Sequence, residues 1–156
     1  MSTTNPAIGP HEPWRIALGE LDEKMGVEVV EQGVEKVVVR MPVEGNRQSL
    51  GLLHGGAMLS LGETAGSWAA LIHASTHGMK CVGVDVAATH LRSAHDGFAT
   101  ATATPVKLGR TLDCHQVDIT DEQGRLLSTF RITNMLIPTN EAPMSPKRVT
   151  RKPLSG

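Results

Sequence analysis

The feature that most constrains this chain is one long helix, expected at residues 57–76, that is apolar on most of its sides. The segment is rich in Ala, Leu and Met, follows His54-Gly55-Gly56 and ends before Gly78. A helix that is apolar nearly all round cannot face water and has to be enclosed by other elements. The rest of the chain must therefore supply a layer that covers this helix.

The remaining sequence is mostly strand-like. A short amphipathic helix is expected at residues 14–24. Six strands are expected, at residues 26–31, 35–43, 81–92, 97–106, 111–120 and 126–137, the last two joined by a hairpin turn at 121–124. One buried helix with five or six antiparallel strands predicts an α+β domain in which a curved sheet wraps around the helix. The open edges of such a sheet favour homodimers formed by edge pairing.

The 156 residues suffice for one domain, expected at residues 14–137 between flexible ends at 1–13 and 138–156. Fifteen Lys and Arg against 16 Asp and Glu give a net charge of −1. The C-terminal segment is basic, with four of these cations against one acid. The domain itself is therefore acidic, and no role in binding nucleic acid is expected.

Cysteine usage and hydropathy indicate the compartment. Cys81 and Cys114 lie alone in apolar stretches, so we expect buried thiols in a reducing environment. The N-terminal residues lack the basic and apolar regions of a secretory signal. The longest stretch of low charge, residues 55–75, carries Glu63 near its middle and is a poor membrane span. These features predict a cytoplasmic protein that does not bind membranes.

Glu63 is the one carboxylate of the expected long helix, and it shares a side of that helix with Ser60, Thr64 and Ser67. This stripe can be a solvated face, but such faces usually carry Lys, Arg and several acids. A lone carboxylate held away from water has a raised pKa, which suits a general base or a nucleophile. We therefore interpret Glu63 as the candidate catalytic group.

The start of the helix offers a second candidate. Free backbone N–H groups at Gly55-Gly56 can hold a developing oxyanion, although the same residues also suit an ordinary turn capped by His54. Gly55 and Glu63 are eight residues apart, about 12 Å along a helix. One carbonyl cannot reach both groups on a single helix. If both serve one reaction, they come from two antiparallel helices, which predicts a twofold dimer with two shared sites.

Further polar residues are less informative. The strand at residues 81–92 is expected to place on one face Val82, Val84, Val86, Ala88, His90 and Arg92. His90 can be structural, whereas Arg92, Lys107 and Arg110 can either hold a phosphorylated ligand tail or simply be solvated. His73 and His77 have the spacing of metal ligands, but no carboxylate or cysteine accompanies them, so no metal site is expected.

Two runs of sequence resemble the signature of the hotdog-fold acyl-CoA thioesterases: RQSLGLLHGGA at residues 47–57 and LGETAGS at residues 61–67. The sequence is most similar to the branch with the glutamate-type 4-hydroxybenzoyl-CoA thioesterases, the phenylacetate-pathway thioesterases and the enterobactin proofreading thioesterases. The resemblance spans about residues 26–137. It implies a long central helix wrapped by an antiparallel sheet, dimers that pair into tetramers, and sites between subunits.

By this resemblance, Glu63 activates water or attacks the thioester directly, and the Gly55 amide of the partner subunit polarises the carbonyl. Gln48 and His54 are implied to orient the thioester, and Ser67 to position the water. No cofactor is implied, because coenzyme A is part of the substrate. The positions implied to line the site or to contact the coenzyme A moiety are Gly83, His90, Leu91, Arg92, Ser93, Lys107, Leu108, Gly109, Arg110, Thr111 and Leu112.

Two departures from the family pattern stand out. Ser93 follows Arg92 where many relatives have proline, so the loop there is expected to differ. Trp68 is bulky and is expected to shorten or flatten the acyl pocket.

We therefore predict hydrolysis of an acyl-CoA or aryl-CoA thioester, or of the corresponding carrier-protein thioester, to the free acid and the thiol. Two alternatives stay open. One is a hotdog dehydratase that acts on hydroxyacyl thioesters, although that pattern carries prolines where Gly55-Gly56 follow His54 here. The other is a non-catalytic dimer that binds acyl-CoA.

Overall fold

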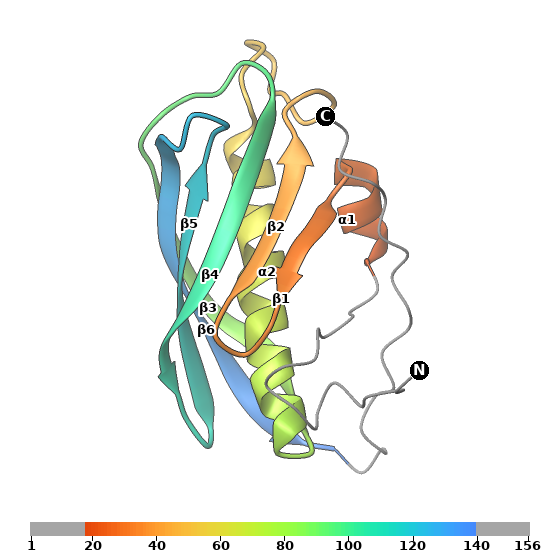
Figure 1. Ribbon diagram of the computed structural model, residues 1–156, viewed down its shortest axis with the longest axis vertical. Coiled ribbons are helices and arrows are strands. Elements are labelled where there is room, and N and C mark those ends of the chain that lie inside the picture. Colours follow the sequence, from red (N-terminus) through yellow and green to blue (C-terminus); the bar gives the residue numbers. More distant parts are fainter. Residues whose placement is uncertain (1–17, 140–156) are drawn as a thin grey trace.

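The computed structural model describes residues 18–139, and in this part of the chain one curved sheet wraps around a long helix (Figure 1). The helices are α1 (Glu20–Met25) and α2 (Gly55–Thr76). The strands are β1 (Glu28–Gln32), β2 (Val37–Pro42), β3 (Met79–His90), β4 (Phe98–Leu108), β5 (Leu112–Thr120) and β6 (Leu126–Pro138). They form one antiparallel sheet in the order β1-β2-β4-β5-β6-β3. The predicted α+β architecture is confirmed.

Most element boundaries follow the sequence pattern, with one clear exception. The helix expected at residues 14–24 is wrong in extent, because α1 covers only Glu20–Met25. Gly19 is extended, and the Asp22 carboxylate accepts a hydrogen bond from the Gly19 N–H at 3.0 Å, which starts the helix there. Residues 14–17 and the expected flexible ends, except Pro138 and Thr139, lie outside the described residues. Within residues 18–139, neither helix combines the length and hydrophobicity needed to span a bilayer.

The core lies between α2 and the inner face of the sheet. Alternate residues of β2, β4 and β5 are fully buried, as their apolar alternation predicts: Val37, Val39, Met41, Ala99, Ala101, Ala103, Val117 and Ile119. Two glycines of α2 allow an unusually close approach to β6. A Cβ atom on Gly62 would lie 1.5 Å from Cζ of Phe130, and one on Gly66 would lie 2.2 Å from Cγ2 of Ile132. The helix therefore packs on the sheet through bare backbone at these two positions.

Strand β3 forms one edge of the sheet and contains a bulge. Gly83 pairs with Asn134 and Asp85 with Thr133, so Val84 has no partner in the ladder. The extra residue reverses the alternation of faces. The prediction that Val82 and Val84 share a face with the following residues of the strand is therefore wrong, and the two side chains are 46 % and 50 % exposed.

The glycine contact predicts a large effect of one methyl group. We expect Gly62→Ala to lower the free energy of unfolding by about 1–3 kcal/mol, because the Phe130 ring fills the space that the methyl needs. Urea unfolding measures this change. Gly33→Ala is the control, since a Cβ there meets only a backbone oxygen at 3.7 Å. Equal unfolding free energies for both variants would contradict the packing described here.

Candidate active site

Helix α2 begins with one backbone donor that the chain leaves unused. His54 is the N-cap: its carbonyl oxygen accepts from the amides of Ala57 and Met58 at 3.0 and 3.1 Å, and its Nδ1 accepts from the Gly56 amide at 2.8 Å. Among the described residues, no acceptor takes the N–H of Gly55. This donor at the positive end of a 22-residue helix is available to an incoming carbonyl or carboxylate.

Two side chains next to this helix start also have donors to spare. Because Nδ1 of His54 accepts a hydrogen bond, the neutral ring carries its proton on Nε2, and the side chain is exposed. Oε1 of Gln48 accepts from the amide of Leu50 within its own turn, which leaves the Nε2 hydrogens of Gln48 as donors. The start of α2 thus offers several hydrogen-bond donors suited to a polarised carbonyl oxygen.

Glu63 lies two turns further along α2 and is exposed in the single chain. The expectation that its own chain holds this carboxylate away from solvent is therefore wrong. The side chain reaches toward β3, where Oε1 lies 3.2 Å from the position that a Cβ on Gly83 would occupy. Within residues 18–139, glycine at position 83 leaves the carboxylate uncovered on the side of β3.

Strand β3 runs beside α2 and links the two ends of the site. At its start Gly83 faces Glu63, and at its end Nε2 of His90 lies 2.9 Å from the position of a Cβ on Gly55. The His90 ring is held through Nδ1, which is 2.9 Å from Oγ of Ser128. Strand β3 thus places His90 beside the N–H of Gly55 and Gly83 beside the carboxylate of Glu63.

The polar stripe expected along α2 divides into separate contacts. The Thr64 hydroxyl donates to Oδ1 of Asp22 at 2.7 Å and ties α2 to α1, while the Ser60 hydroxyl donates to the carbonyl of Gly56 at 2.9 Å. The Ser67 hydroxyl accepts from Nδ2 of Asn134 at 3.3 Å. Trp68 is 8 % exposed and packs in the hydrophobic core. Ser67 is therefore the member of the stripe that stays near Glu63.

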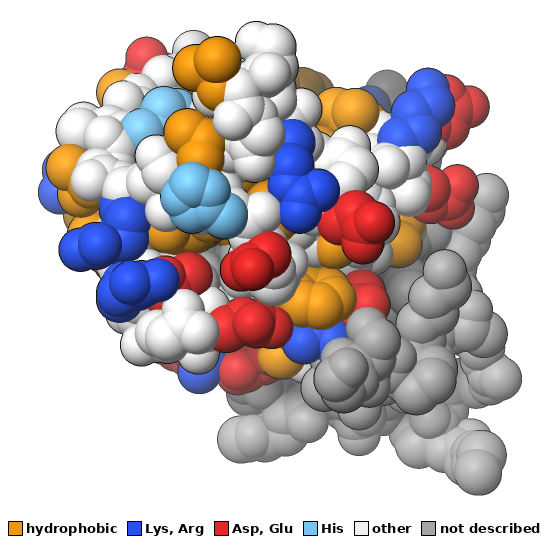
Figure 2. Space-filling model, turned by 90° about the horizontal axis from the view of Figure 1, so that it is seen from above, with side chains coloured by type: hydrophobic (Ala, Val, Ile, Leu, Met, Phe, Trp, Pro, Cys, Tyr) orange, Lys and Arg blue, Asp and Glu red, His pale blue; other side chains and the backbone are white. Residues whose placement is uncertain are grey.

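The positions implied for coenzyme A fall at the two ends of the molecule. Residues 91–93 follow β3 at the end where α2 begins, and they are exposed. The turn at residues 108–112, with Lys107 before it, joins β4 to β5 at the opposite end (Figure 1). Figure 2 views the end where α2 begins and shows histidines among acidic and basic side chains. One chain does not bring the implied cations together.

Sequence reasoning missed a buried polar cluster near the C-terminal end of α2, made of His73, Asp113, His115 and Asn134. Nδ1 of His73 lies 2.7 Å from Oδ2 of Asp113, whose Oδ1 accepts from the Gly109 amide at 2.9 Å. Both ring nitrogens of His115 lack a partner among the described residues. The alternation of β5 contained the signal, since Asp113 and His115 share the inward face with the apolar Val117.

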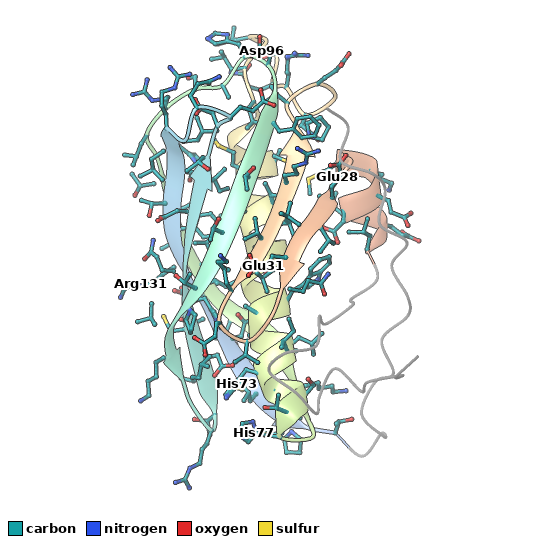
Figure 3. The ribbon with its side chains drawn as sticks, viewed as in Figure 1. Glu28, Glu31, His73, His77, Asp96 and Arg131 are labelled. Atoms are coloured by element: carbon teal, nitrogen blue, oxygen red, sulfur yellow. The ribbon has the colours of Figure 1, made fainter. Side chains whose placement is uncertain are left out.

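These residues do not make a metal site. No group of three or more His, Cys, Asp or Glu within residues 18–139 is arranged to hold a metal ion. Figure 3 shows His73 and His77 at the end of α2 that is remote from Asp96, and His73 is engaged by Asp113.

The two cysteines are partly rather than fully buried, which corrects the expectation. Burial raises the pKa of the Cys81 thiol to about 11, with Asp113 adding to the effect. This pKa favours the protonated thiol at neutral pH, which is the less nucleophilic form of cysteine.

Comparison with known proteins shows the family of the chain. A model of the thioesterase superfamily matches residues 50–128. The proofreading thioesterase EntH of Cronobacter turicensis is 35% identical over 122 residues, which cover 78% of this chain and 88% of EntH. The 1,4-dihydroxy-2-naphthoyl-CoA hydrolase of Escherichia coli is 37% identical over 107 residues, which cover 67% of this chain and 77% of that protein.

Comparison with solved structures indicates the same family. The crystal structure of a Haemophilus influenzae thioesterase superposes with a TM-score of 0.73 at 31% identity, covering 83% of this chain and 98% of the other. Fold and sequence together define a thioester hydrolase with the hotdog fold. The chain belongs to the thioesterase superfamily, as its sequence signature implied.

The buried cluster predicts a pH-dependent stability. Burial lowers the pKa of His115, although Asp113 opposes the shift, so the unfolded chain takes up this proton at a higher pH than the folded protein does. The stability that the neutral His115 side chain contributes is fully present above about pH 6.5, the pKa of histidine in the unfolded chain. This stability is lost as the pH falls below that value, at roughly 1 kcal/mol per pH unit.

Unfolding free energies at pH 7.5 and 5.5 measure this effect. We expect the decrease between the two pH values to be smaller in His115→Gln than in the unsubstituted protein. His77→Gln, at an exposed position, should not change it. The same decrease in all three proteins would contradict the prediction.

Proposed function

We propose that the protein hydrolyses an acyl-CoA or aryl-CoA thioester to the free acid and coenzyme A. The observation that carries the proposal is the unused N–H of Gly55 at the start of α2, eight residues before the exposed carboxylate of Glu63. The amide polarises the thioester carbonyl, and the carboxylate supplies the base or the nucleophile. The acyl carbon gains an oxygen, the C–S bond breaks, and the thiolate leaves and takes up a proton.

The edge strand β3 supports a dimer that completes this site. Two copies of β3 paired antiparallel, with the twofold axis between Val86 and Ala87, place Gly83 of one chain opposite His90 of the other. Gly83 lies beside Glu63, and His90 lies beside Gly55. The carboxylate of one protomer then meets the free amide of its partner, and the two chains form two equal sites.

The remaining site residues are assigned by the same pairing. In this proposal the spare donors of His54 and Gln48 serve the carbonyl oxygen, and Ser67 holds the attacking water. His90 lies where the two chains meet, next to the amide that receives the carbonyl.

The coenzyme A tail would cross the dimer. Antiparallel pairing of β3 brings residues 91–93 of one chain toward the end of its partner that carries the turn at 108–112, so Arg92 and Arg110 contribute from different protomers to the phosphates. A carrier-protein thioester presents the same chemistry. No metal or redox cofactor takes part in this proposal, and the dimers are expected to pair into tetramers in the cytoplasm.

Glu63→Gln tests the chemistry. We expect kcat to fall by on the order of 10³, because the amide cannot accept a proton or attack the carbonyl. Thiol release from short, long, branched and aromatic acyl-CoAs measures activity. Glu31→Gln is the control. Glu31 lies on β1, at the edge of the sheet opposite β3, and forms an ion pair with Lys36, so this substitution should leave kcat unchanged. Unchanged thiol release by Glu63→Gln would remove Glu63 from the mechanism.

Hybrid dimers test the sharing of the site. Gly55→Pro removes the amide at a helix position that tolerates proline, and Glu63→Gln removes the base. Each homodimer should be inactive. A hybrid of the two, purified through two different tags, contains one intact site and should recover about half of the normal activity.

The control for the hybrid is Gly55→Ala, which adds the same Cβ near His90 but keeps the N–H. It should be more active than Gly55→Pro. An inactive hybrid would show that Glu63 and Gly55 of one site do not come from two chains. Binding of acyl-CoA with no thiol release would favour a non-catalytic binding protein instead.

A further inference from the structure

Asn134 is a fully buried amide on β6 for which the proposed reaction has so far no use. Its Cα pairs with Gly83 of β3 on one side and with Asp113 of β5 on the other. Nδ2 donates to Oγ of Ser67 at 3.3 Å, and Oδ1 has no partner among the described residues. A buried amide with an unsatisfied oxygen lowers stability relative to an apolar side chain, so its presence calls for another reason.

Gly83 places this amide next to the candidate base. A Cβ on Gly83 would lie 3.2 Å from Oε1 of Glu63 and 3.8 Å from Nδ2 of Asn134. The two side chains therefore come close to the same point, Glu63 from helix α2 and Asn134 from strand β6. Because position 83 has no side chain, nothing from β3 stands between them.

A comparison of two serines on α2 shows what Asn134 does. The Ser60 hydroxyl donates to the carbonyl of Gly56, four residues earlier, which is the usual bond of a helical serine. Ser67 makes no such bond to the carbonyl of Glu63 among the described contacts, and its oxygen instead accepts from Asn134. Asn134 occupies one lone pair of the Ser67 oxygen, and the hydroxyl hydrogen has no acceptor among the described contacts, so it stays available as a donor.

We infer that Asn134 is a positioning residue for hydrolysis, an inference that rests on the proposed function. Its N–H turns the Ser67 hydroxyl away from the helix backbone and toward the water that attacks the thioester. That water accepts a hydrogen bond from Ser67, gives one proton to the Glu63 carboxylate and forms the new bond to the acyl carbon. The leaving thiolate then takes the proton from Glu63, which restores the starting state.

A double-mutant cycle on the full-length protein tests the inference. We expect Asn134→Ala to lower kcat by about 10- to 100-fold with little change in KM, because the water is misplaced while substrate contacts remain. Ser67→Ala should cause a similar loss, and the double variant should be no worse than either single variant. A role in stability alone would instead leave kcat per folded molecule unchanged, and an effect on kcat independent of Ser67 would add to that of Ser67→Ala in the double variant.

Two further variants keep the test decisive. Asn134→Thr has a similar volume, suits a strand and cannot reach Ser67, so it should reproduce the loss even where the alanine variant folds poorly. Leu136→Ala is the matched control, two residues along the same inward face of β6 and 5 % exposed. It should lower stability but leave kcat per folded molecule unchanged.

The outcomes distinguish a failure of the positioning role of Asn134 from a failure of the proposed function. If the unsubstituted protein releases thiol but the Asn134 variants match Leu136→Ala in kcat, only the positioning role is overturned. Additive losses of kcat in the double variant also overturn it. If the unsubstituted protein hydrolyses no acyl-CoA thioester, the proposed function fails, and the positioning role fails with it.

Discussion

The rigidity of α2 is the constraint on which the proposed site depends. The helix holds an unused amide at its first residue and a carboxylate eight residues later, and no side-chain movement removes a separation of about 12 Å. In the proposed function, a single chain therefore carries two half-sites that cannot serve one carbonyl. Three observations are consistent with two half-sites. Glu63 is exposed, β3 is an edge strand, and the cations implied for coenzyme A lie at two ends of the molecule.

Glycines determine how the helix presents these groups. Gly62 and Gly66 bring α2 so close to β6 that Phe130 and Ile132 contact its backbone, which fixes the rotation of the helix about its axis. With Gly62 turned inward, the next residue, Glu63, has to point out of the core. Gly83 plays the complementary part on β3, where the absence of a side chain leaves room beside the carboxylate. The geometry of the proposed site thus follows from positions where side chains are missing.

The sequence predicted the enclosed helix and most of the strand alternation because both depend on local pattern, and a short motif was enough to mark the candidate site. It failed where a contact between distant elements decides. The bulge at Val84 reverses the faces of β3, and no local signal marks it. The burial of Asn134 depends on pairing with two strands that are far away in the sequence. The exposure of Glu63 could not be predicted either, since the pattern that suggested enclosure does not say which molecule encloses it.

The inner face of the sheet changes character along β6, and this change connects stability with function. Near the start of α2 it is aromatic and aliphatic, and Phe130 and Ile132 hold the helix in place. Further along, Asn134 and the neighbouring Asp113 and His115 bury polar groups at the expense of stability. Oδ1 of Asn134 and both ring nitrogens of His115 have no partner in the part of the chain that the structure describes. A sheet selected only for stability would continue the aliphatic face. In the proposed function, the buried amide of Asn134 next to Ser67 serves instead to hold a water in one orientation before a thioester arrives.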